Sequence, residues 1–490
     1  MSRRLPLVLT LVVLPGALLG QAPVRFADHF LDRTMRVDYY HAGNAAEETA
    51  TIDRIYDQGP WAGSLTVLSD PFQFGRCRFL VTDAATGTLL FSKGFDSYFG
   101  EYKTSEPALR GVRRTYHESA LLPFPKRKVK VTLERRDREN RFYPFFSQEI
   151  DPADPAISRE RPAQDVRVFE LRRSGDPHVK VDLAFVAEGY TVAEEAKLRA
   201  DFDRFVGILA KLEPYRSHLD AFNLYGVWRP SAESGCDEPG YGLFKSTAVG
   251  TTFDSLGSER YVLTEENRAL RDIASRVPAD ALVIMINHKR YGGGGIYNLY
   301  CTFTTDNQWH EYLFLHEFGH SFAGLGDEYY TSEVAFNDFY PRGVEPADPN
   351  ITALLDPRAL KWRDLVTPGT PVPTPWEKAE FDKLDEAYQK VRREMNARIA
   401  KLKRAGAPAA EIAKAEEESE RLSRENGRQV DAFLGRSKFR GQVGAFEGAG
   451  YASQGLYRPA VDCLMFTRGT KPLCRVCEAA VLKMIESYTR

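Results

Sequence analysis

The spacing of apolar residues divides the chain into segments of different character. Between residues 23 and 160, apolar positions alternate with polar ones, most clearly at 76–82, 88–92 and 128–133. A period of two is typical of strands that bury one face, so the pattern predicts an all-β sandwich domain over 23–160. A proline-rich stretch at 151–155 indicates a linker.

The period changes after residue 179. Apolar runs typical of buried strands lie at 181–186, 222–228 and 281–286. Between the first two, apolar residues recur at helical spacing over 198–209, behind a capping-box pair of Thr191 and Glu194. Strands that alternate with helices predict an α/β sheet within a second domain over 165–490.

A third pattern occupies residues 377–440. Apolar residues repeat there at spacings of three and four amid dense charge, at Phe381, Leu384, Tyr388, Val391, Met395, Ile399 and Leu402. This spacing predicts an amphipathic helix. A break at 406–408 and a second charged helical stretch predict a helical hairpin inserted within the second domain. We expect a structural role for it, with a partner-binding arm as the alternative.

The first twenty residues have a basic start, an apolar run and a small residue at the end. This pattern predicts a signal peptide over 1–20 that is cleaved near Gly20, and therefore a secreted or periplasmic protein. A membrane anchor is the alternative, but Pro15 and Gly16 interrupt the run, which is shorter than a spanning helix requires. No later segment is long and apolar enough to span a bilayer, so we expect no membrane association after cleavage.

Charge adds little to this picture, because 66 basic residues nearly balance 68 acidic ones. The balance gives no electrostatic reason to expect nucleic acid as a partner. The 23–160 segment shows no metal-ligand or nucleophile motif, so we expect that domain to be a spacer packed against the second one, with a recognition role as the alternative.

Six cysteines are compatible with an oxidising compartment. Cys474 and Cys477 form a single Cys-x-x-Cys pair without the second pair typical of a structural zinc site. We therefore predict a disulfide from Cys463 to one of them. Cys236 and Cys301 are a second candidate pair, and Cys77 is expected to be a small buried apolar residue.

The candidate chemistry lies in the run from Leu315 to Tyr329. His316 and His320 stand four residues apart, so on a helix both imidazoles lie on one face and can reach one metal ion. Glu317 then lies beside the open position of the metal, where a general base is needed. A catalytic zinc takes three protein ligands and a water, so a third ligand is required.

The third ligand is expected just after the helix. Gly324 can adopt the left-handed conformation that ends a helix and turns the chain back toward the histidines. Asp327 is the preferred ligand, because it lies three residues after the glycine, as the third ligand does in the metzincin pattern. Glu328 is the alternative, since here three residues rather than two separate His320 from Gly324.

The whole motif, His-Glu-x-x-His-x-x-x-Gly-x-x-Asp-Glu, resembles the secreted IgA-protease-type zinc metallopeptidases, a metzincin-like family. Further segments that carry the resemblance lie at 185–190, 233–235, 291–298, 448–459 and 462–466. It implies an α/β catalytic domain, one Zn²⁺ and hydrolysis of peptide bonds, without identifying immunoglobulin as the substrate. It also implies that Met465 packs beneath the ligand histidines as a Met-turn.

Many metzincins place a tyrosine two residues after this methionine, but here Thr467 occupies that position. Tyr451 or Tyr457 could take its role, although we expect both to be structural. The resemblance also places glycines 292–295 beside the substrate cleft. We expect an edge-strand turn there, with a substrate peptide adding as a strand, so that Gly294→Pro impairs turnover.

These observations lead to one expected function and two alternatives. The chain is expected to be an exported zinc-dependent endopeptidase acting on a protein or peptide, with His316, His320 and Asp327 as metal ligands and Glu317 as general base. A zinc amidase or deacetylase acting on cell-wall or glycan substrates is one alternative. The other is an exported binding protein that has lost activity.

Overall fold

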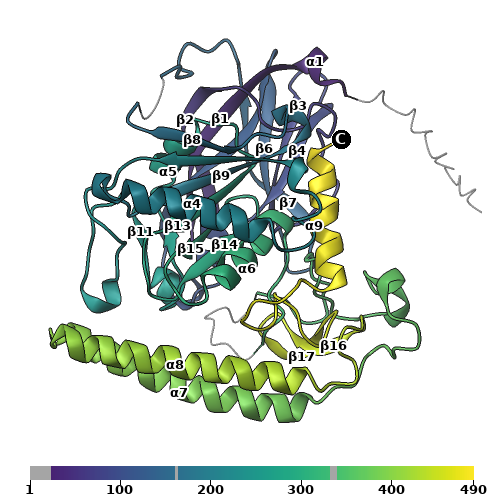
Figure 1. The fold of residues 1–490 in the computed structure, drawn as a ribbon. Helices are drawn as coiled ribbons and strands as arrows, with labels where there is room; N and C mark the ends of the chain where they lie inside the picture. The colour runs from purple at the N-terminus through teal and green to yellow at the C-terminus, as the bar shows by residue number, and fades with distance from the viewer. Residues whose placement is uncertain (1–23, 161–163, 331–338) are drawn as a thin grey trace, which may run out of the picture.

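The computed structural model describes residues 24–160, 164–330 and 339–490. Its N-terminal part contains two antiparallel sheets with strand orders β2–β1–β5 and β4–β3–β6–β7 (Figure 1). The strands are β1 Phe30–Gly43, β2 Glu48–Gly59, β3 Cys77–Asp83, β4 Leu89–Phe95, β5 Arg114–Pro125, β6 Val129–Arg136 and β7 Phe142–Ile150. Three short helices accompany them, α1 Phe26–His29, α2 Tyr98–Tyr102 and α3 Glu106–Leu109. The predicted signal peptide lies outside the described residues.

Alternating side chains explain why these segments form strands. In β3 every second residue is buried, and Phe79 and Val81 enter a core that also receives Val37 from β1 and Leu133 from β6. Burial of one face per sheet is what a period-two sequence produces. The predicted all-β character of this region is confirmed.

The second part is built on a six-stranded sheet with the order β14–β15–β13–β9–β10–β8. The four inner strands are parallel and the two edge strands run antiparallel to their neighbours. The strands are β8 Arg167–Arg172, β9 Val181–Glu188, β10 Phe222–Trp228, β13 Ala281–Ile286, β14 Gly293–Ile296 and β15 Tyr300–Thr304. Two-stranded pairs lie outside this sheet, β11 Thr251–Thr252 with β12 Leu263–Thr264 and β16 Phe446–Ala449 with β17 Ala452–Arg458.

Helices cover both faces of this sheet, which explains why β9 is buried along its whole length. Leu183 and Phe185 share one core with α4 Glu195–Leu209, α6 His310–Ala323 and α9 Arg475–Tyr488. Val186 points to the other face, into a core formed with α5 Asn267–Ala274 and with α2 of the N-terminal part. The mixed α/β architecture predicted for this region is therefore present.

The N-terminal part packs directly on the α/β part. Asp38, Asp53 and His117 lie close enough to resemble a metal-binding group, which the sequence did not reveal. Each has a protein partner: Arg36 pairs with Asp38 at 3.0 Å, Arg268 with Asp53, and Asn267 with His117. These contacts form a polar network that includes residues of both parts.

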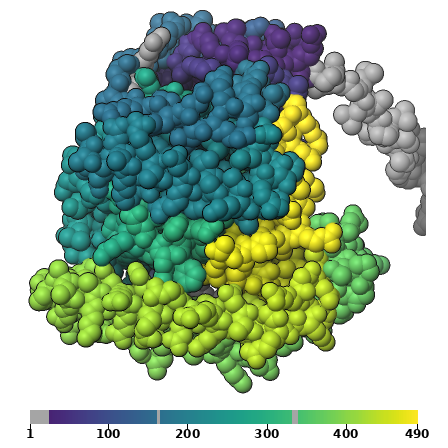
Figure 2. Space-filling model, in the orientation of Figure 1, coloured from purple at the N-terminus to yellow at the C-terminus, as the bar shows by residue number. Residues whose placement is uncertain are grey.

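The predicted hairpin is present as two long helices, α7 Lys378–Arg404 and α8 Ala409–Leu434, separated at the expected break. They lie side by side along the lower face of the molecule in Figure 2. Lys403 of α7 forms an ion pair with Glu416 of α8, with Nζ and Oε1 2.9 Å apart. The same Nζ lies 3.7 Å from Glu238 Oε2 of the α/β part. Among the helices of the described ranges, none has the length and apolar character needed to cross a membrane.

Candidate metal centre

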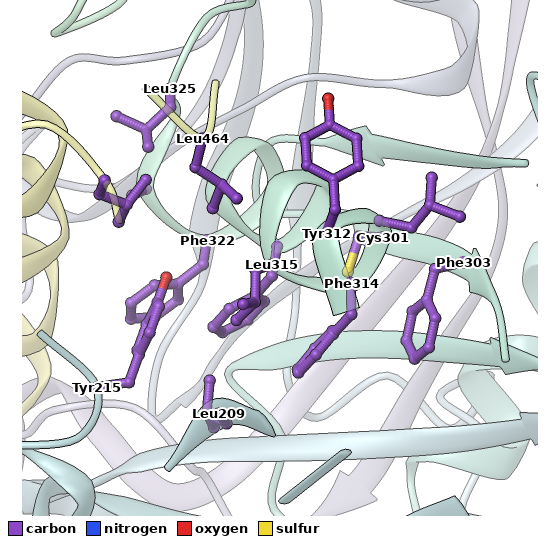
Figure 3. Close-up of a cluster of buried hydrophobic side chains, with 14 of the residues drawn as sticks. Leu209, Tyr215, Cys301, Phe303, Tyr312, Phe314, Leu315, Phe322, Leu325 and Leu464 are labelled. Atoms are coloured by element: carbon purple, nitrogen blue, oxygen red, sulfur yellow. The ribbon is translucent and has the colours of Figure 1, made fainter. Parts of the chain in front are cut away.

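Helix α6 carries the histidine motif through the buried interior of the α/β part. Phe314, Leu315 and Phe322 pack into the core with Leu209 and Tyr215, as Figure 3 shows. Tyr312 points to the opposite side of the helix, toward the cavity. A helix that is apolar on more than one side is expected when it is covered on more than one side, and this burial fixes the direction in which its polar side chains point.

The helix ends at Gly324, as predicted. This residue has a φ of 62° in the left-handed region, and its N–H donates to the carbonyl of His320 at 3.1 Å. Glycine adopts this conformation without steric cost, so the chain can reverse directly after the helix. The reversal brings Asp327 back to the two histidines.

Three ligand-type atoms converge at this point. His316 Nε2 and His320 Nε2 lie 3.1 Å apart, and each is 3.1 Å from Asp327 Oδ1. Each imidazole uses its other nitrogen on a carbonyl: His316 Nδ1 lies 3.2 Å from Leu464 O, and His320 Nδ1 lies 2.5 Å from Leu325 O. A neutral imidazole that donates through Nδ1 keeps a lone pair on Nε2. In that form His316 and His320 each direct a lone pair toward Asp327 Oδ1.

This arrangement fits a divalent cation. Asp327 Oδ1 is buried and has no hydrogen-bond partner among the described residues, whereas the adjacent oxygen Oδ2 accepts from the Tyr451 hydroxyl. Two imidazoles and one carboxylate are a donor set typical of catalytic zinc, and second ring nitrogens bonded to carbonyls are typical of metal-binding histidines. Glu317 also has a carboxylate oxygen within 4.8 Å of the histidine nitrogens.

The electrostatics of the site favour positive charge at its centre. Burial opposes ionisation of Asp327, but the close imidazoles of His320 and His316 outweigh it and hold the pKa of this carboxyl well below its usual value. Burial lowers the pKa of His320, whereas Asp327 outweighs it and raises the pKa to about 9. Burial raises the pKa of Glu317; the two histidines oppose this rise and Asp327 adds to it. A carboxyl with a raised pKa is suited to accept and return a proton.

Glu328 faces away from the histidines. Its backbone N–H donates to Met465 O at 2.9 Å, and its carboxylate accepts from Asn350 at 3.1 Å and Cys477 at 3.2 Å. Of the two acidic residues that the sequence left as alternatives, Asp327 is the one that the fold brings to the histidines.

The segment around Met465 packs against the helix that carries the two histidines. The Met465 sulfur lies so close to α6 that a methyl group on Gly319 would approach it to 3.1 Å. Tyr451 lines the cavity and bonds Asp327, whereas the backbone of Tyr457 pairs with Thr352 and its side chain is absent from the cavity lining. Tyr451 therefore orients a candidate ligand.

The glycine run lies at the edge of the sheet, as expected, but glycines 293–295 belong to strand β14 and not to a turn. Its Gly293 already bonds the 260–262 segment, through Arg260 O at 3.2 Å and Val262 N at 3.3 Å. A Cβ on Gly294 would approach the Tyr261 ring to 2.4 Å. Proline at 294 would therefore disturb internal packing whether or not a peptide binds there.

A cavity of about 660 Å³ opens over the histidines. Its lining includes Glu317 and Asp327 from the α/β part, but also Arg76, Arg135 and Tyr143 from the N-terminal sheets. The N-terminal part is therefore a wall of the cavity rather than only a spacer. The sequence could not show this, because these side chains come from strands far from the motif.

The disulfide predictions are wrong for this structure, in which all six cysteines are free. Cys236 and Cys301 belong to cores on opposite faces of the six-stranded sheet, so they cannot meet. Cys463 and Cys477 have their sulfurs 3.9 Å apart, well beyond the S–S bond length of about 2.05 Å. Cys77 is buried, as expected.

Comparison with known families assigns both parts of the chain. The sequence model described as Peptidase M64 N-terminus matches residues 25–147, and that of IgA Peptidase M64 matches residues 169–485. No curated protein matches the chain. The second match covers more than half of the sequence and includes the helix that carries His316 and His320. Membership of a peptidase family implies a protein substrate. The chain thus belongs to the IgA Peptidase M64 family and is a metallopeptidase with an M64 N-terminal region.

Proposed function

We propose that this metallopeptidase is a zinc-dependent endopeptidase in which His316, His320 and Asp327 hold one Zn²⁺. The observation that carries the proposal is the convergence of three lone-pair atoms at 3.1 Å spacing, with Glu317 beside them under a cavity large enough for a peptide segment. The left-handed Gly324 and the Met465 sulfur against α6 support a metzincin-like arrangement. The core shared by the two N-terminal sheets supports a sandwich.

The ion, when bound, would act as a Lewis acid that lowers the pKa of a water toward about 7 and polarises the scissile carbonyl. Glu317 accepts the proton of the attacking water and delivers it to the departing amine. Arg260 lines the cavity and contacts the Tyr329 hydroxyl at 3.5 Å, and it is our candidate for stabilising the oxyanion.

The test compares two glutamate-to-glutamine variants on the same helix. Glu317→Gln should bind zinc as the wild type does but lose several orders of magnitude in kcat, because the amide cannot accept the proton. The matched control is Glu311→Gln in the first turn of α6, where the carboxylate accepts a hydrogen bond from the Thr470 hydroxyl at 3.3 Å. This control should retain full activity.

Cleavage sites are best mapped by mass spectrometry on a proteome-derived peptide library. Internal cuts that require Glu317 are the expected result. Wild-type turnover in Glu317→Gln would refute the base assignment, and release of products only from glycan or cell-wall substrates would favour the amidase alternative.

We also propose that the protein is exported, which rests on the basic and apolar pattern of residues 1–20. Expression with and without this segment tests the proposal. A mature N-terminus close to residue 21 in the exported fraction is expected, and an intact Met1 in a cell-retained product would refute it.

A further inference from the structure

A second cluster of metal-ligand side chains lies behind the histidine site. It consists of Cys463, Cys474, Cys477 and Glu328, and one ligand atom of each lies within 4.8 Å of the others. Cys463 comes from the Met465 segment, Cys474 and Cys477 from the start of α9, and Glu328 from the loop after α6. The fold therefore brings three separate segments to one point.

The spacing of these atoms is that of a tetrahedral zinc site. With Zn–S bonds near 2.3 Å and a Zn–O bond near 2.0 Å, tetrahedral geometry places two sulfurs about 3.8 Å apart and a sulfur and an oxygen about 3.5 Å apart. The Cys463 and Cys477 sulfurs lie 3.9 Å apart, and Cys477 Sγ lies 3.2 Å from Glu328 Oε1.

The polar groups around the cluster also leave room for a cation. Glu328 is fully buried, and its Oε2 has no hydrogen-bond partner among the residues that the structure describes. The nearby Arg458 instead donates to the carbonyls of Gly448 and Val461. A buried carboxylate without a compensating positive charge is unfavourable, so this position favours a bound cation.

The surroundings already resemble a thiolate metal site. The backbone N–H of Cys474 points at the Cys463 sulfur at 3.2 Å, and Asn350 donates to Glu328 at 3.1 Å. Such donors orient and stabilise the side chains that bind a metal. Thiolates are soft ligands that favour zinc over magnesium or calcium.

We propose that Cys463, Cys474, Cys477 and Glu328 bind a second, structural Zn²⁺. Four protein ligands close the site to water, unlike the three-ligand site of the histidines. Glu328 follows Asp327 directly, so the second ion anchors the backbone that presents Asp327 to the histidines. The site also joins α9 and the Met465 segment to the loop after the motif helix.

The first test is the zinc content of the full chain, purified without reductant or chelator. We expect two zinc ions per chain in the wild type and one in the double variant His316→Ala/His320→Ala. Cys477→Ser should lose one ion. The matched control Cys77→Ala, a buried cysteine in β3 outside the cluster, should keep both.

Cobalt substitution gives an independent readout. A site with three thiolates produces sulfur-to-cobalt charge-transfer bands in the near ultraviolet, whereas a site of two histidines and an aspartate does not. These bands should be present in the wild type and in the histidine double variant, and absent from Cys477→Ser.

Two results would overturn the proposal: a wild type without thiolate–cobalt bands, or a disulfide between any two of the three cysteines in non-reducing peptide mapping. One ion per chain together with thiolate–cobalt bands would retain the second site and refute the histidine site. The two proposals can therefore fail separately.

Discussion

The contact between β14 and the motif helix offers a sharp test of how the site is positioned. Gly295 lies so close to α6 that a Cβ on it would stand 2.4 Å from the carbonyl oxygen of Glu317 and 2.8 Å from the Cβ of His320. Both neighbours are fixed by the helix, so neither can rotate away. Gly295→Ala must therefore separate the strand from the helix by about 1 Å to restore van der Waals contact.

The expected cost follows from that displacement. Overpacking of one methyl group against backbone costs about 1–3 kcal/mol, and the smaller unfolded-state entropy of alanine returns about 0.4–1 kcal/mol. The free energy of unfolding should therefore fall by about 1–2 kcal/mol. Because Glu317 and His320 move with the helix, kcat/KM should fall by about 100-fold, as expected for a misplacement of about 1 Å.

The measurements are denaturant unfolding and peptide turnover, with Gly207→Ala as the matched control. Gly207 lies within α4, and a Cβ there would meet nothing within 4 Å. The control should be more stable by about 0.5–1 kcal/mol, because alanine favours a helix over glycine, with unchanged turnover. If Gly295→Ala matched the wild type in both stability and turnover, close packing of β14 would not position the site.

Three further outcomes are expected. Tyr451→Phe removes the hydroxyl that bonds Asp327, so affinity for zinc at the histidine site should fall 10–100-fold in chelator competition, while Tyr457→Phe should leave it unchanged. Burial opposes ionisation of Glu238, but His288, Lys403 and Arg290 outweigh it and lower its pKa to about 2. The ionised carboxylate should therefore contribute about 3 kcal/mol to the free energy of unfolding above pH 4.5, and this contribution should be lost as the pH falls toward 2. Glu238→Gln should abolish this loss in acid unfolding titrations. Dialysis against a zinc chelator should abolish peptidase activity, and re-addition of Zn²⁺ should restore it; activity that survives complete metal removal would contradict the proposed chemistry.

The sequence predicted the elements whose information is local. Alternation in β3, the apolar run of β9 and the repeat of α7 each depend on which residues are neighbours along one strand or helix. The four-residue interval between His316 and His320 is equally local, because helix geometry alone places them on one face. Gly324 could be predicted for the same reason, as the residue able to end the helix and reverse the chain.

The tertiary structure decided everything that joins distant segments. It selected Asp327 over Glu328 for the histidines, because the Met465 carbonyl binds the backbone of Glu328 and turns its carboxylate toward Cys477. It also separated Cys236 from Cys301 and placed N-terminal side chains in the cavity wall. Local spacing determines which face a side chain occupies, whereas the packing of that face against other segments determines which partner it meets.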